Sequence, residues 1–236
     1  MLTAPQNPSP GLARVRERIA RAAREACRDP ASVTLIGVAK SQPAAAIARA
    51  VDDGLADIGE NYLQEAREHA AALAGRRLCW HFVGALQSNK TRPVAERFDW
   101  VHTVDRLKLA ERLSAQRPAA MPPLAVCIQV NLAGEPTKSG ITPAQLPALA
   151  QAVARLPRLA LRGLMALPPE EQDVARQRRW FRELRLLRDA LAQDGLALDA
   201  LSMGMSGDFE AAIAEGATHL RVGTALFGPR PPPPAR

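Results

Sequence analysis

The chain has 236 residues, with 31 lysines and arginines against 24 aspartates and glutamates, and a hydrophobic share of 47% that is ample for a globular core. No apolar run approaches the ~20 residues of a membrane-spanning helix, so no membrane partner is expected. No secretory signal is visible at residues 1–10, and we expect a cytoplasmic protein. Cys27, Cys79 and Cys127 form no CxxC pair, which argues against a disulfide framework or a metal ribbon. The net charge of +7 does not predict a nucleic-acid partner, because the arginines alternate with acids along helices and aromatic residues are only 4% of the chain.

An amphipathic helix is predicted over residues 10–28, and eight apolar, strand-like runs follow it. Segments with helical spacing separate the runs. The clearest of these segments is 170–194, where one apolar stripe ends at Asp194-Gly195. The stripe consists of Val174, Phe181, Leu184, Leu187 and Leu191. The strand-like runs are 33–39, 56–60, 78–84, 100–104, 124–131, 159–167, 199–204 and 219–223.

Strands that alternate with helices pair in parallel, and eight such units in a chain of this length predict a single (β/α)8 TIM barrel. We expect the barrel to occupy residues 10–229, with the first helix as an addition to it. Residues 1–9 are then a flexible N-terminus and residues 230–236, which are mostly proline, an extended tail.

The first strand-like run ends close to Lys40, one of only four lysines in the chain. In a barrel of this class, functional groups lie at the C-terminal ends of the strands, and a lysine amine there can act as a nucleophile. A lysine that merely reaches solvent at the end of a strand is the alternative.

Two segments rich in glycine and hydroxyl residues follow the seventh and eighth strands, where barrels often bind phosphate. They are 202–208, with Gly204, Ser206 and Gly207, and 221–228, with Gly223-Thr224. Their backbone N–H groups favour an anion, although Ser206 could instead cap the following helix. The four histidines have no metal-ligand spacing, so no metal site is predicted.

Seven motifs occur along the chain in a fixed order: the strand-end lysine, "GENY", "WHFVGALQSNK", "TKSG", "RGLMAL", "SMGMSGDFEAAI" and "RVGTALFG". Together, over residues 10–228, they closely resemble the pyridoxal phosphate homeostasis protein family. That resemblance implies a barrel similar to the N-terminal domain of alanine racemase, and pyridoxal 5′-phosphate (PLP) held as a Schiff base on Lys40. Members often carry a second lysine two residues later, where this chain has Gln42.

The resemblance also implies a role for each remaining site residue. The loops with Ser206, Gly207, Gly223 and Thr224 hold the phosphate, Asn61 and Met203 line the ring, and Arg221 faces the pyridine nitrogen. Taken alone, Asn61 is equally well explained as a helix-capping partner of Gln64, and Arg221 as a strand-end charge paired with an acid.

Three functional classes are compatible with these residues. The first is a PLP carrier or regulator involved in intracellular PLP homeostasis, without a dedicated catalytic residue. Its partners would be PLP and the apo forms of PLP-dependent enzymes, and the chain would be a monomer or weak dimer. The second is an amino-acid racemase using Lys40 and Tyr62; alanine racemase takes its second base from an additional β-domain, which we do not expect here. The third is an aldolase-like barrel with a different Lys40 Schiff base. The first class is preferred.

Overall fold

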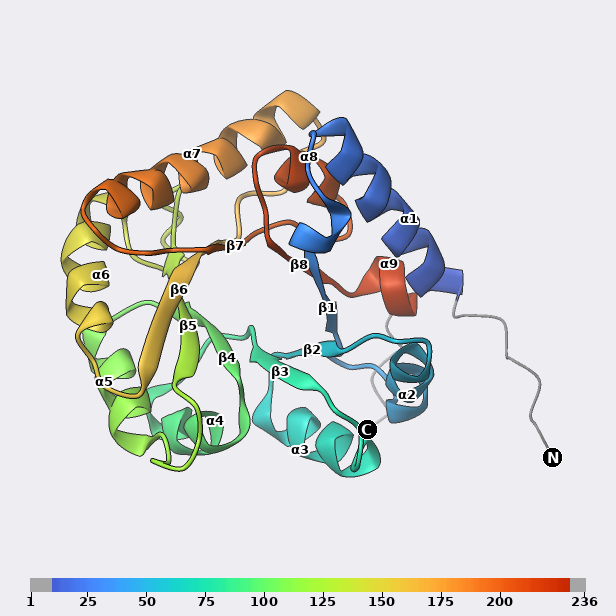
Figure 1. The fold of residues 1–236 in the computed structure, drawn as a ribbon, viewed down its shortest axis with the longest axis horizontal. Helices are drawn as coiled ribbons and strands as arrows, with labels where there is room; N and C mark the ends of the chain where they lie inside the picture. The colour runs from blue at the N-terminus through green and yellow to red at the C-terminus, as the bar shows by residue number, and fades with distance from the viewer. Residues whose placement is uncertain (1–9, 230–236) are drawn as a thin grey trace.

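Eight parallel strands close into a barrel in which each strand pairs with the next along the chain and β8 pairs with β1 (Figure 1). The computed structural model describes residues 10–229; the predicted N-terminus 1–9 and tail 230–236 lie outside them. The strands are β1 (Thr34–Val38), β2 (Asp57–Glu60), β3 (Cys79–Phe82), β4 (Trp100–Val104), β5 (Leu124–Val130), β6 (Leu159–Ala166), β7 (Ala200–Ser202) and β8 (His219–Val222). The predicted barrel and its eight strands are confirmed.

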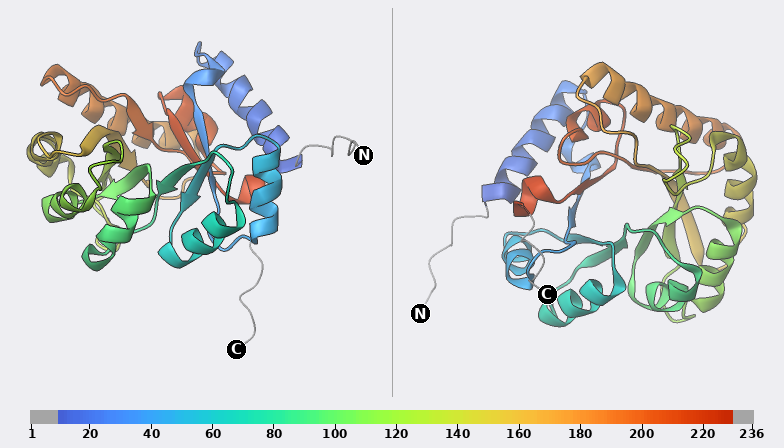
Figure 2. Two further views of the ribbon diagram at one scale, coloured as in Figure 1. Left: turned by 60° about the horizontal axis from the view of Figure 1, so that its bottom comes forward. Right: turned by 180° about the vertical axis from the view of Figure 1, so that it is seen from behind.

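Helices surround the strands, as the view from behind in Figure 2 also shows. They are α1 (Pro10–Glu25), α2 (Ala44–Asp52), α3 (Leu63–Ala72), α4 (Thr91–Arg97), α5 (Leu107–Gln116), α6 (Leu146–Ala154), α7 (Val174–Gln193), α8 (Phe209–Ala214) and α9 (Thr224–Phe227). None of the helices in residues 10–229 is long and apolar enough to cross a membrane.

Most strand residues are buried, because helices cover the outside of the barrel and side chains fill the inside. All seven residues of β5, for example, are buried. Gly163 on β6 allows an unusually close approach to β7, since a Cβ at this position would lie 1.8 Å from the carbonyl oxygen of Ala200.

The predicted stripe of α7 is correct except at its first residue. Phe181, Leu184 and Leu191 are buried and Leu187 is partly buried, but Val174 is 60% exposed. Val174 is the first helical residue, directly after the N-cap Asp173, whose carboxylate accepts a hydrogen bond from the Arg176 N–H. The helix therefore reaches the barrel surface only after its first turn.

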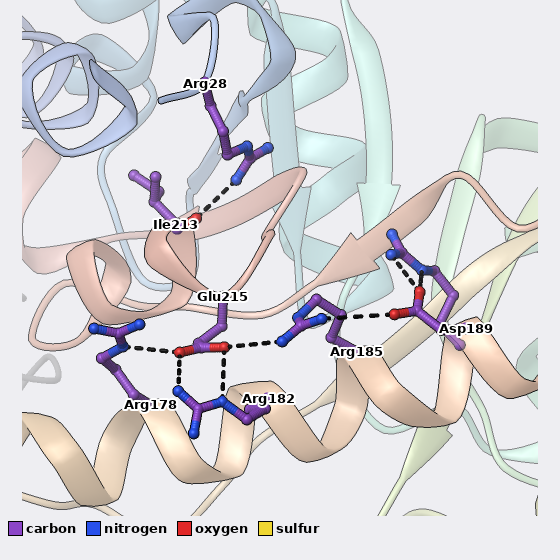
Figure 3. Close-up of polar contacts among 8 residues, drawn as sticks. Arg28, Arg178, Arg182, Arg185, Asp189, Ile213 and Glu215 are labelled. Atoms are coloured by element: carbon purple, nitrogen blue, oxygen red, sulfur yellow. Dashed lines mark hydrogen bonds and ion pairs between the residues drawn. The ribbon is translucent and has the colours of Figure 1, made fainter. Parts of the chain in front are cut away.

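The turn between α8 and β8 is tied to α7 through Glu215 (Figure 3). This carboxylate is almost fully buried and accepts hydrogen bonds from Arg178 at 2.8 Å and Arg182 at 2.9 Å, with Arg185 at 3.4 Å. Burial alone would raise the pKa of Glu215, but the arginines outweigh it and lower that pKa. Glu215 and these three arginines, here called the ion cluster, fix the turn before β8 against the outer helix α7.

Candidate cofactor pocket

A cavity of about 370 Å³, here called the barrel pocket, lies at the C-terminal ends of the strands. Its walls come from the segments that follow β1, β2, β3, β6, β7 and β8, so residues far apart in sequence meet there. The lining residues are Val38, Lys40, Asn61, Val83, Leu167, Met205, Ser206, Gly207, Arg221, Gly223 and Thr224. Every predicted site residue except Met203 is among them.

Lys40 lies in a tight turn two residues beyond β1 and is half-buried. Next to it, Ser41 adopts a left-handed backbone conformation (φ 57°), and its N–H donates to the Glu65 carboxylate at 2.8 Å. The Lys40 Nζ lies 5.3 Å from the centre of the Tyr62 ring. The turn therefore places an amine at the pocket wall beside one aromatic ring.

A buried pair that the sequence reasoning missed supports this turn. The Nε2 of His69 lies 3.1 Å from the Gln42 carbonyl oxygen, and its Nδ1 lies 2.6 Å from the Glu60 carboxylate. Burial alone lowers the pKa of His69, but these two acceptors outweigh it and raise that pKa. Burial also raises the pKa of Glu60. In the sequence, the pair is visible only as the glutamate of "GENY" and a histidine nine residues later, and this spacing matches no helix or strand periodicity.

The two predicted anion loops meet at one side of the barrel pocket. The Ser206 hydroxyl accepts a hydrogen bond from the Ala225 N–H at 3.2 Å, which joins the loops and leaves the hydroxyl proton available. Within residues 10–229, the backbone N–H groups of Gly207, Gly223 and Thr224 donate to no protein acceptor. The expectation that Ser206 caps α8 is wrong, because Asp208 occupies the N-cap position.

Met203 is not among the residues that line the barrel pocket, and its place against the cofactor ring stays a prediction. It is fully buried in the hydrophobic core, while Met205, 40% exposed, lines the pocket. Gly204 between them has φ +95°, so the backbone leaves the strand conformation after Met203 and the strand alternation no longer applies.

Arg221 lies at the floor of the barrel pocket and is 5% exposed. Its Nη1 donates to the Ser202 hydroxyl at 2.7 Å and its Nη2 to the Ala166 carbonyl at 2.9 Å. Burial lowers the pKa of Arg221 to about 10, against the opposing effect of the Asp208 carboxylate. Because no carboxylate among the described residues forms an ion pair with it, the alternative of a strand-end salt bridge is not supported.

Asn61 and Tyr62 also border a second, neighbouring cavity of about 740 Å³, together with Gln87 and Lys90. The capping alternative for Asn61 is wrong: α3 begins at Leu63, Tyr62 is its N-cap residue, and no side chain caps it. Gly84 after β3 approaches Asn61 so closely that a Cβ there would lie 2.3 Å from the Asn61 carbonyl oxygen. Asn61 is thus held at the pocket by backbone packing.

Comparison with known proteins places this barrel in a family. Residues 11–231 match the family model for the alanine racemase N-terminal domain. The chain is 59% identical over 219 residues to the pyridoxal phosphate homeostasis protein of Pseudomonas aeruginosa, covering 93% of this chain and 94% of that one. It is 51% identical over 222 residues to the protein of the same name from Escherichia coli K12, covering 93% and 95%.

Solved structures agree with the sequence relatives. PipY of Synechococcus elongatus, solved with PLP bound, superimposes with a TM-score of 0.81 at 41% identity, covering 91% of this chain and all of that one. An alanine racemase of Clostridium difficile, at 14% identity, shares the fold with a TM-score of 0.74 over 98% of this chain and 61% of that one. The chain therefore belongs to the alanine racemase N-terminal domain family and, within it, to the pyridoxal phosphate homeostasis proteins.

Proposed function

We propose that this protein binds PLP as a Schiff base on Lys40 and serves intracellular PLP homeostasis without dedicated catalytic turnover. The observation that carries the proposal is the barrel pocket, where one lysine amine, one buried arginine and two N–H-rich loops converge from opposite ends of the sequence. Its volume of about 370 Å³ lies in the range of small-molecule sites.

The residues present fit PLP by charge and by shape. Uncommitted N–H groups at Gly207, Gly223 and Thr224, with the Ser206 hydroxyl, suit the phosphate. A Cβ at Gly207 would meet no atom within 4 Å, so open space exists at that wall for a ligand group. Lys40 would supply the attachment, and Arg221 with Asn61 would meet the ring.

The proposed lack of catalytic turnover of amino acids rests on Arg221. PLP, when bound, supplies an electron sink for amino-acid chemistry. A guanidinium can only donate hydrogen bonds, so opposite the pyridine nitrogen it favours the unprotonated ring, a weaker sink than one paired with a carboxylic acid. Apo forms of PLP-dependent enzymes are the proposed recipients, and the cytoplasmic location and the monomeric or weakly dimeric state stay predictions.

The test of Lys40 uses absorbance and chemical trapping. The purified protein with PLP should show the visible band of lysine-bound PLP, and borohydride should fix the cofactor on one peptide containing Lys40. Lys40→Ala should lose both signals. The exposed Lys108 on α5 provides the control, since Lys108→Ala removes an amine outside the barrel pocket. A full band in Lys40→Ala would contradict the assignment.

A racemase that uses Lys40 and Tyr62 is the second candidate, because the structure brings this tyrosine beside the lysine. Two-base racemisation needs proton donors on both faces of the substrate. Deuterium exchange at the α-carbon of several amino acids, followed by NMR, separates the two functions. Slow exchange with retained configuration supports the carrier, whereas fast racemisation that is lost in Tyr62→Phe supports the enzyme.

A further inference from the structure

A continuous chain of hydrogen bonds, here called the interior chain, runs through the barrel to Arg221. The Nε2 of His81 lies 3.0 Å from the Asp57 carboxylate, and the Nδ1 of His81 lies 3.0 Å from the Nε2 of His102. The Nδ1 of His102 then lies 2.8 Å from the Ser202 hydroxyl, which accepts from Arg221 at 2.7 Å. Three side chains, His81, His102 and Ser202, thus join a carboxylate to a guanidinium.

The interior chain crosses the inside of the barrel from one end to the other. His102 is on β4 and Ser202 on β7, strands that are not neighbours in the sheet, so their bond spans the interior. Asp57 begins β2, and Arg221 lies near the end of β8. His81, His102 and Ser202 are fully buried. A perturbation at the N-terminal end of the barrel can therefore reach the pocket at the other end through these contacts.

When both imidazole rings are neutral, the two ends fix the direction of every hydrogen bond. Arg221 can only donate, so the Ser202 oxygen accepts its N–H. Burial, with the nearby His81, His219 and Arg221, lowers the pKa of His102 well below its ordinary value, so this ring is neutral and carries one proton. Its tautomer is determined by the neighbouring groups.

If His102 carried its proton on Nδ1, its Nε2 would be an acceptor and a neutral His81 would donate to it from Nδ1. The bare Nε2 of His81 would then face the carboxylate oxygen of Asp57, two acceptors 3.0 Å apart. With both rings protonated on Nε2, each contact has one donor and one acceptor. Donation then runs in one direction, from Arg221 through Ser202, His102 and His81 to Asp57.

This direction matters because Arg221 is a buried cation without a directly paired acid. Uncompensated buried charge is costly, and a polarised chain that ends on a carboxylate offsets part of that cost. We propose that Asp57, His81, His102 and Ser202 are positioning residues, through which a carboxylate at the opposite end of the barrel holds the Arg221 guanidinium in place for PLP. The proposal rests on the proposed function insofar as Arg221 meets the cofactor.

The first readout needs no cofactor. Nitrogen-15 NMR of the imidazole rings should show the Nε2–H tautomer at both His81 and His102. Asp57→Leu removes the terminal acceptor and should populate the Nδ1–H tautomer at both rings. Asp199→Leu is the matched control, because Asp199 lies just before β7, outside the interior chain, where it pairs with Arg162. An Nδ1–H tautomer at His102 in the parent protein would overturn the proposal.

The second readout is PLP affinity, arranged as a double-mutant cycle. Asp57→Leu and Ser202→Ala should each weaken PLP binding by about 2- to 30-fold, the range for residues that act on a site through others. Because Ser202→Ala already interrupts the hydrogen bonds of the interior chain, adding Asp57→Leu should cause no further loss of PLP affinity. The control Asp199→Leu should bind within about twofold of the parent. Additive losses, or unchanged affinity in Asp57→Leu, would overturn the proposal.

Asp57→Asn tests the same role of the carboxylate if Asp57→Leu does not fold. Its amide oxygen still accepts from His81, so the tautomers should persist while the lost charge weakens PLP binding; unchanged binding would refute the role of the charge. Failure of the proposed function is separately visible, since the parent protein would then lack the Lys40-dependent absorbance while its tautomers still report on the interior chain.

Discussion

The interior histidines should make folding stability depend on pH, and His219 gives the sharpest case. Its ring packs 4.7 Å from that of Trp100 inside the barrel, and its Nδ1 lies 2.8 Å from the Thr218 hydroxyl. Burial, together with the nearby His81, lowers the pKa of His219 to about 4. In the unfolded chain the same ring has a pKa of about 6.5.

These two pKa values determine whether acidification stabilises or destabilises the folded protein. Between the folded and the unfolded pKa, the unfolded state binds a proton that the folded state does not, so stability falls as the pH falls through this window. For one group with these pKa values, the free energy of unfolding decreases by about 2 kcal/mol between pH 7 and pH 5. Below the folded pKa the loss stops, because both states are then protonated.

Urea unfolding of the parent protein and of His219→Asn at both pH values measures this loss. Asparagine can still contact the Thr218 hydroxyl but does not titrate, so the variant should lose about 2 kcal/mol less than the parent on acidification. The lowered pKa of His102 comes first from burial, which the variant retains, so its effect largely cancels in the comparison. Equal pH dependence in the two proteins would refute the assigned effect of burial on His219.

Three substitutions test other features of the structure. Gly163→Ala should destabilise the protein by about 3 kcal/mol or more in urea unfolding, since its methyl group would collide with the Ala200 backbone; a smaller loss would show that β6 and β7 can separate. Gly207→Ala should leave stability within about 0.5 kcal/mol, but should weaken PLP binding in a direct titration because its methyl group enters the barrel pocket. Equal PLP affinity would place the phosphate elsewhere. Glu215→Gln should cost about 1–2 kcal/mol of stability, a modest value because Arg178 and Arg182 remain about half exposed. An unchanged urea midpoint would show that the ion cluster contributes nothing.

The barrel could be predicted because its signals are local. A buried parallel strand such as β5 is a continuous apolar run, and an outer helix such as α7 carries an apolar stripe, whatever the rest of the chain does. The order of these elements then leaves few topologies open. The structure departs from the predicted pattern where a strand or helix ends: after the turn at Gly204, Met205 and not Met203 lines the pocket, and the start of α7 leaves Val174 exposed.

The sequence also placed Lys40, Asn61, Arg221 and the two loops in motifs at the C-terminal ends of β1, β2, β7 and β8, and closure of the barrel brings these strand ends together at the pocket. What only the tertiary structure decided is how buried polar groups find their partners. His69 bonds to Gln42, Ser206 joins the loop at Ala225, and His102 reaches Ser202, one hundred residues away, across the barrel. A buried polar atom must be satisfied by whichever group the closed barrel places within hydrogen-bond distance, and no periodicity along the chain encodes that distance.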